Sequence, residues 1–176
     1  MEKKEELMKA FATSIEMEEK GREFYLKSAK ECRNELGKRV FEALADDETR
    51  HIVAIKGYCE NISKKDKAPQ LCKVMPRHKT IDERLIFGKR EAETLKNTIF
   101  KADELKAYQI AMKMENEGYA FYKKVFESVS DPEIKELYKF LLSEEESHFE
   151  MISNTYEYLK DPAAWFASQE KPIVEG

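Results

Sequence analysis

Six acidic and imidazole side chains recur at matching positions in the two halves of this chain. Each half contains one lone glutamate and, 30 residues further along, a Glu-x-x-His motif. The six residues are Glu18, Glu48 and His51 in the first half and Glu115, Glu145 and His148 in the second, 97 positions later. Carboxylates and imidazoles with open coordination positions suit iron or manganese. The doubled pattern therefore predicts two metal ions held between equivalent halves of one fold.

The segments around the two lone glutamates also match. Residues 17–25 read Met-Glu-Glu-Lys-Gly-Arg-Glu-Phe-Tyr and residues 114–122 read Met-Glu-Asn-Glu-Gly-Tyr-Ala-Phe-Tyr, so that Met, Glu, Gly, Phe and Tyr are identical in register. Self-similarity of this kind indicates an internal repeat. Tyr25 and Tyr122 follow the glutamates by two helical turns and share their helix face. They are expected either to hydrogen-bond the metal ligands or to be ordinary core tyrosines.

Composition and spacing favour helices throughout. The chain has 176 residues, of which only six are Gly and five are Pro. Apolar residues recur every three or four positions and predict helices at about 4–31, 36–61, 103–129 and 132–160. Two short connections would make two antiparallel hairpins. We predict a single all-α domain over residues 1–176, a four-helix bundle with pseudo-twofold symmetry.

The remaining segments connect or follow these helices. Residues 62–101 have the length of a crossover between the second and third helices, with a further helix at about 81–97. The segment 161–176 is a tail, which we expect to fold back and bury Trp165 and Phe166. Ser130-Asp131-Pro132 supplies an N-cap and a first-turn proline for the fourth helix.

Charge and hydropathy exclude several classes of partner. The net charge is -4 and the pI is near 5.6, whereas nucleic-acid binding calls for a basic patch. No run of about 18 apolar residues suggests a membrane span, and no signal peptide is expected, so a cytoplasmic location is the expectation. Cys32, Cys59 and Cys72 include no Cys-x-x-Cys motif and are interpreted as small buried side chains rather than disulfides or ligands.

The four glutamates of the repeat lie within apolar series, where an uncompensated carboxylate is costly. Two divalent ions would balance four carboxylates. We expect Glu48 and Glu145 to bridge both metals. Glu18 and Glu115 would each bind one metal. His51 and His148 would each give one nitrogen to one metal. Residues three apart share a helix face, so the Glu and His of one motif are expected to address one metal centre.

Other acidic residues beside the repeat are expected to be solvated, namely Glu19, Glu117, Glu144 and Glu146. An alternative interpretation of the whole set is a metal-free bundle whose Glu and His side chains point outward. That alternative leaves unexplained why the matching positions fall within apolar stripes.

The paired Met-Glu-x-x-Gly-x-x-Phe-Tyr segments and the paired Glu-x-x-His motifs resemble the rubrerythrin branch of the ferritin-like superfamily, over about residues 5–160. The resemblance implies a non-haem di-iron centre, with manganese or a mixed pair as alternatives to two iron ions. It also implies reduction of hydrogen peroxide or oxygen with electrons from a redox protein such as rubredoxin, and a homodimer.

Two departures from the family pattern bear on these expectations. Without paired cysteines, the chain is expected to lack a rubredoxin domain and to take electrons from a separate protein. Gly118 stands where typical members carry an additional glutamate ligand, and we expect Gly118→Glu to supply it. Two alternative functions therefore remain, which are ferrous iron oxidation and storage of the ferritin type and a non-enzymatic metal-binding bundle.

Overall fold

The computed structural model describes residues 2–64 and 102–169. The predicted helix at about 81–97, most of the crossover and the end of the tail lie outside these residues. Within the described ranges every regular element is a helix: α1 Glu2–Glu31, α2 Glu35–Lys64, α6 Ala102–Ser128, α7 Pro132–Lys160 and α8 Pro162–Gln169. The predicted all-helical four-helix bundle is confirmed. The helix α2 continues to Lys64, into the stretch predicted as crossover.

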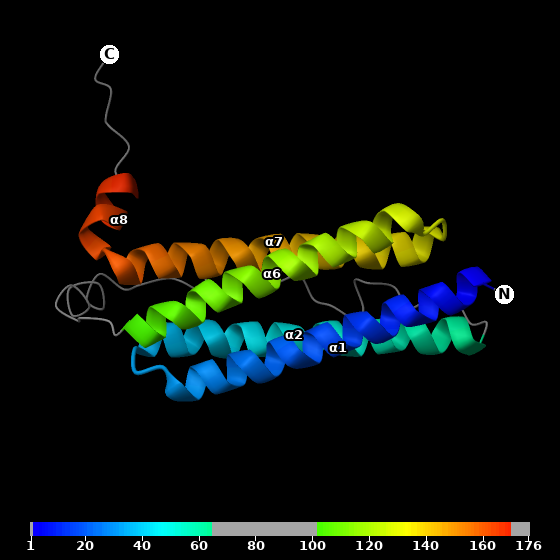
Figure 1. Cartoon of the computed structure of the whole chain (residues 1–176), viewed down its shortest axis with the longest axis horizontal. Helices are drawn as coiled ribbons and strands as arrows, with labels where there is room; N and C mark the ends of the chain where they lie inside the picture. The colour runs from blue at the N-terminus through cyan, green and yellow to red at the C-terminus, as the bar shows by residue number, and fades with distance from the viewer. Residues whose placement is uncertain (1, 65–101, 170–176) are drawn as a thin grey trace, which may run out of the picture.

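The bundle consists of two helical hairpins that face each other. The helix α1 packs along α2, and α6 packs along α7, which places the residues of each half of the repeat in one hairpin (Figure 1). Between the hairpins, α2 contacts α7 and α1 contacts α6. All four glutamates of the repeat lie near the middle of their helices and can therefore meet in the interior.

Local hydrogen bonds fix where two of the helices begin. The Asp131 carboxylate accepts from the backbone N–H groups of Glu133 and Ile134 at 2.9 and 3.2 Å, and Pro132 follows in the first turn. Asn34 plays the same part for α2, since its side-chain oxygen accepts from the N–H of Gly37 at 2.9 Å. These contacts satisfy N–H groups that have no partner within the helix.

Two apolar clusters pack the bundle, one on each side of the repeated glutamates along every helix. One cluster contains the Phe41 and Tyr108 rings, with centroids 4.8 Å apart. The other contains Phe11 and Tyr138, stacked at 6.1 Å. Positions 11 and 108 are equivalent in the repeat, as are 41 and 138. The pseudo-twofold symmetry therefore extends from the acidic residues into the core.

The tail begins with a short helix that the sequence analysis did not anticipate. In α8, Trp165 and Phe166 are half-buried and pack edge-to-face on Tyr158, with centroids 5.4 and 5.9 Å apart. The aromatic pair therefore contacts the bundle as expected, but the two side chains are half-buried rather than buried. Asp161 caps α8 by accepting from the N–H of Ala164 at 3.0 Å, and Pro162 occupies its first position. None of the described helices combines the length and apolar character needed to cross a bilayer.

Candidate metal centre

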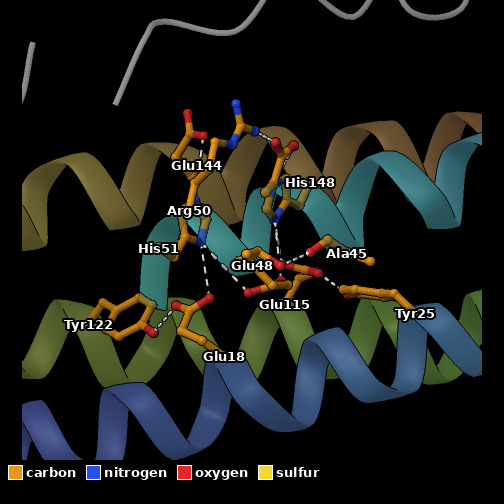
Figure 2. Close-up of polar contacts among 12 residues, drawn as sticks. Glu18, Tyr25, Ala45, Glu48, Arg50, His51, Glu115, Tyr122, Glu144 and His148 are labelled. Atoms are coloured by element: carbon orange, nitrogen blue, oxygen red, sulfur yellow. Dashed lines mark hydrogen bonds and ion pairs between the residues drawn. The ribbon is translucent and has the colours of Figure 1, made fainter. Parts of the chain in front are cut away.

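The structure brings all six residues of the repeat together in the middle of the bundle, each at most 5% exposed (Figure 2). Their donor atoms form two clusters in which all members lie within 4.8 Å of one another. The clusters are Glu18, His51 and Glu145, and Glu48, Glu115 and His148. The Glu and His of each motif were expected to address one centre, but each cluster takes its histidine and its motif glutamate from different halves. This exchange arises because α2 and α7 face each other across the bundle.

The two histidines turn their Nδ1 atoms toward the carboxylates. The Nδ1 of His51 lies 3.0 Å from a Glu18 oxygen, and the Nδ1 of His148 lies 3.4 Å from a Glu115 oxygen. Glu48 lies between both imidazoles, with one oxygen 3.7 Å from the Nδ1 of His51 and the other 3.9 Å from that of His148. A carboxylate that spans two histidines in this way has the position required of a bridging ligand.

Two buried tyrosines cross between the halves. Tyr25 of α1 donates a hydrogen bond to Glu115 of α6, and Tyr122 of α6 donates to Glu18 of α1. These tyrosines were expected either to hydrogen-bond the candidate ligands or to be ordinary core residues, and the structure shows the hydrogen bonds. Burial, and then the adjacent carboxylate, raises the pKa of each phenol well above its ordinary value. Both hydroxyls therefore keep their protons and act as donors.

Two further acids stand behind the histidines and were not identified from the sequence. The Nε2 of His148 lies 3.4 Å from an Asp47 oxygen, and the Nε2 of His51 lies 3.5 Å from a Glu144 oxygen. Asp47 also forms an ion pair with Arg50. The prediction that Glu144 is solvated is wrong, because its side chain is only 15% exposed. The signal was available, since positions 47 and 144 are equivalent and both acidic.

Glycine at two equivalent positions makes room for the motif glutamates. A Cβ at Gly118 would overlap the Glu145 carboxylate and lie 2.9 Å from its Cδ, while a Cβ at Gly21 would lie 3.3 Å from the Cδ of Glu48. A side chain at position 118 therefore requires the Glu145 carboxylate to shift, and the supply of an extra ligand by Gly118→Glu stays a prediction. Any side chain at this position begins where an existing carboxylate lies.

A pocket of about 220 Å³ opens onto the carboxylates between α1 and α6. Both glycines and both tyrosines line it, together with the glutamates of the repeat, Met17 and Met114. Asp47 and Glu144 belong instead to α2 and α7. The pocket thus reaches the centre on the side of the carboxylates. On another side, Asp47 and Glu144 lie beside the Nε2 atoms of the two histidines.

The buried carboxylates differ in their proton affinity. Burial, followed by the charge of Glu18, raises the pKa of Glu48 well above its ordinary value, and burial followed by Glu115 does the same for Glu145. For Glu18 burial also raises the pKa, but the charge of His51 and three hydrogen bonds outweigh burial and bring the pKa to about 2. Without a bound cation, the protein therefore does not keep Glu48 and Glu145 ionised as readily as ordinary carboxylates.

The histidines hold protons more tightly than usual. Burial lowers the pKa of His51, but the charge of Glu18 and hydrogen bonds to Glu144 and Glu18 outweigh burial and raise the pKa to about 10. The pKa of His148 is raised in the same sense, chiefly by Glu115. In the absence of a cation, the two imidazolium groups are the positive charges that balance the carboxylates.

The donor atoms fit a bound cation. Several buried atoms of the set make only contacts of 3.4–3.9 Å to an opposite charge, without a hydrogen bond of regular geometry among the described residues: Oε2 of Glu115, Nε2 of His51, and Nδ1 and Nε2 of His148. Buried polar atoms are nearly always paired, so unpaired atoms at one point call for an explanation such as an ion. Oxygen and imidazole donors without thiolates suit iron or manganese.

A bundle of four helices that carries such clusters in its interior is a ferritin-like protein with candidate metal sites. The sequence profile of the rubrerythrin family matches residues 9–156, so the chain belongs to the rubrerythrin family. A solved structure of a hypothetical protein from Pyrococcus furiosus has the same fold, with a TM-score of 0.63 and 22% identity over 88% of this chain and 90% of that one. No curated protein matches the sequence.

Proposed function

We propose that this chain is a non-haem di-iron oxidoreductase that reduces hydrogen peroxide, with molecular oxygen as an alternative oxidant. The observation that carries the proposal is the pair of buried Glu/His clusters, in which several donor atoms lack a hydrogen bond of regular geometry within the described part of the chain. Membership of the rubrerythrin family supports an oxidoreductase with two iron ions. Manganese or a mixed metal pair would use the same ligands.

In this proposal each residue has a definite task. Glu48 and Glu145 would serve both metal positions, and one lone glutamate and one histidine would complete the ligands of each position. The chemistry that bound ferrous iron supplies is the delivery of two electrons to the O–O bond of the oxidant. Tyr25 and Tyr122 hold the lone glutamates in place through the crossed hydrogen bonds. Asp47 and Glu144 orient the imidazoles, as acids behind metal-bound histidines commonly do.

The pocket between α1 and α6 supports a small substrate. Its volume of about 220 Å³ is below the range of roughly 300–1,000 Å³ that is typical of sites for drug-sized ligands. Hydrogen peroxide and oxygen fit easily in this space. Because the pocket reaches the carboxylates directly, the oxidant would approach from the side away from Asp47 and Glu144.

Further parts of the proposal concern the surroundings of the reaction. Electrons would come from a separate redox protein such as rubredoxin, and the chain would work as a cytoplasmic homodimer. The family resemblance motivates the separate donor and the dimer, and the hydropathy of the sequence motivates the location. Size-exclusion chromatography with light scattering tests the dimer, and turnover with added rubredoxin and its reductase tests the donor.

The decisive experiment compares oxidants on anaerobically iron-loaded protein. We expect two iron ions per chain by elemental analysis, and faster oxidation by peroxide than by oxygen in stopped-flow absorbance. His51→Ala should abolish the reaction, whereas Glu146→Ala at an exposed neighbouring position should not. Protein that retains no more than adventitious iron would contradict the proposal.

A second candidate function is ferrous iron oxidation and storage. It is favoured by the set of four glutamates and two histidines, in which Gly118 stands in place of the additional glutamate. Faster oxidation by oxygen, with iron accumulating well beyond two ions per chain, would replace the peroxidase proposal with this one.

A further inference from the structure

Aromatic side chains form a line from the candidate metal centre toward the end of α1. It starts at Tyr25, whose hydroxyl donates to Glu115. The Tyr25 ring stacks on Phe41 with centroids 6.1 Å apart and planes inclined by 22°, and Phe41 lies 4.8 Å from Tyr108. All three rings are fully buried. They lead from Glu115, a candidate metal ligand, to the end of the bundle where the turn between α1 and α2 lies.

The line ends at a thiol. The point where a Cβ of Gly37 would stand is 2.5 Å from the Tyr108 hydroxyl oxygen and 2.7 Å from the Cys32 sulfur, so both atoms pack against this glycine. Any larger residue at position 37 would push them apart. Cys32 is half-buried, and its thiol donates weakly to the carbonyl of Asn34 at 3.5 Å. The half-buried thiol thus lies beside Gly37, as the buried phenol does, at the turn between α1 and α2.

The hydroxyl of Tyr108 is anomalous for a core tyrosine. It is 0% exposed and has no hydrogen-bond partner in residues 2–64 and 102–169. A buried hydroxyl without a partner is unfavourable, and phenylalanine would fill the same space without that cost. The equivalent position in the other half of the repeat is indeed a phenylalanine, Phe11, and the equivalent of Cys32 is Val129. The phenol and the thiol therefore occur together in one half only.

We propose that Cys32 is a redox-active thiol that donates electrons to the metal centre through Tyr108, Phe41 and Tyr25. The inference rests on the proposed peroxide reduction and adds a donor to it. Tyr25 lies on α1 and Cys32 follows its last residue, seven positions further along, which is about 10 Å at the helical rise. The rings of Phe41 and Tyr108 lie along this route, so that electrons would cross shorter distances from ring to ring.

The reaction balances with hydrogen peroxide as the oxidant. The Cys32 thiol and one water molecule give a sulfenic acid, two electrons and two protons, and the protons pass to solvent at the half-exposed end of α1. At the centre, one hydrogen peroxide takes up two electrons and two protons and gives two water molecules. The S–O bond forms at Cys32 while the O–O bond of the peroxide breaks.

A thiol reductant would restore Cys32. One external thiol condenses with the sulfenic acid to give a mixed disulfide and water, and a second thiol releases the Cys32 thiol as the external disulfide forms. The chemical class of this electron donor is therefore a low-molecular-weight thiol or a protein dithiol. It would act alongside the redox protein of the proposed function.

Direct attack of Cys32 on peroxide is disfavoured. Burial raises the pKa of this thiol, and the thiolate is the nucleophilic form. Oxidation of Cys32 should consequently depend on iron in the centre. This dependence separates the proposed route from ordinary surface oxidation.

The test uses the full chain in a Cys59→Ser, Cys72→Ser background, with and without iron. One equivalent of hydrogen peroxide is added without oxygen, sulfenic acid is trapped with dimedone, and the Cys32 peptide is quantified by mass spectrometry. We expect labelling of the iron-loaded protein and its loss in the metal-free protein. Tyr108→Phe should also abolish labelling, although it removes only a hydroxyl without a partner among the described residues and should not lower the thermal unfolding midpoint. Tyr156→Phe, away from the line of rings, should label like the parent.

The outcomes separate this inference from the proposed function. If the iron-loaded protein consumes peroxide but Cys32 stays unlabelled, the inference is overturned and the proposed function stands. Labelling that is equal with and without iron, or undiminished in Tyr108→Phe, also overturns it. If the iron-loaded protein does not consume peroxide, both fail. Peroxide turnover with dithiothreitol as the sole reductant, lost in Cys32→Val, would support it.

Discussion

Gly118 shows how a residue without a side chain can determine the geometry of a ligand. A Gly118→Ala Cβ would overlap the Glu145 carboxylate, so this variant should bind less iron per chain. The equivalent Gly21→Ala places its Cβ at 3.3 Å from Glu48, which a small shift relieves, and should lose less. Elemental analysis after equal reconstitution measures both. A Gly118→Glu variant with full iron content would show that Glu145 moves aside more easily than we infer.

Asp47 tests the contribution of the acids behind the histidines. Asp47→Asn removes the negative charge beside the Nε2 of His148, and loss of such a partner typically lowers metal affinity by roughly 10–100-fold. Asp46→Asn, one residue away and exposed, is the matched control and should bind iron as the parent does. Competition with a chromogenic chelator gives the affinities. Equal behaviour of the two variants would contradict the assigned role.

The six ligand candidates could be found from the sequence because their types and spacing repeat. Asp47 and Glu144 could not be separated from solvated acids in the same way, since each is adjacent to a motif glutamate on a charged helix. Only the close approach of α2 and α7 buries them. The contact between Gly118 and Glu145 was also not predictable, because spacing along one helix does not reveal which side chain of a neighbouring helix fills the space beside it.

Among the helices, α7 has the best-defined beginning. Removing the two side-chain hydrogen bonds of Asp131 in Asp131→Ala should lower the free energy of unfolding by about 1 kcal/mol. Ser130→Ala, at the preceding exposed position, should have little effect. Urea unfolding of the metal-free protein measures the difference. Equal stability of the two variants would show that the capping contacts contribute less than their geometry suggests.

The four long helices followed from periodicity because each has one face packed on a partner for many turns. The short helix α8 has only two turns, too few for a periodic signal. Its capping residue and first-turn proline, Asp161 and Pro162, were interpreted only as the end of the preceding helix. The arrangement Asp-Pro followed by small and aromatic residues also predicts a new helix, as it did at Asp131.

The whole bundle should fold without metal. Apolar clusters lie on both sides of the acidic layer, so the four helices have buried contacts that do not involve the ligands. Chelation is therefore expected to leave the far-ultraviolet circular dichroism helical while lowering the thermal midpoint, because a ligand bound only to the folded state stabilises that state. A random-coil spectrum of the metal-free protein would contradict this.

The stability of the metal-free protein should depend on pH. The pKa of His51 rises on folding from 6.5 to about 10, so its stabilising contribution is fully present below the unfolded value and is lost as pH rises through the folded value. Ionisation of Glu48, whose pKa is also raised, opposes folding in the same direction. The thermal midpoint should therefore fall between about pH 7 and pH 10. Calorimetry with His51→Gln as the comparison should show a smaller fall, and a midpoint that rises with pH would contradict the assignment.

The repeat predicted the architecture of the molecule but not how its halves interact. Sequence identity between residues 17–25 and 114–122 shows which positions are equivalent. It does not show that Tyr25 reaches Glu115 rather than Glu18. Such pairings depend on which helices meet across the bundle, and this information lies in the packing of α1 against α6 and of α2 against α7.

The crossed tyrosine contacts bear on the origin of the chain. A polypeptide with only one hairpin would carry a lone glutamate and a tyrosine that cannot satisfy each other. Two copies of that hairpin, related by a true twofold axis, would satisfy both, because each tyrosine would reach the glutamate of the other copy. This is the pattern expected when a gene for a self-pairing hairpin is duplicated and fused. In a single chain the two halves can differ from each other, as Tyr108 and Cys32 differ from Phe11 and Val129.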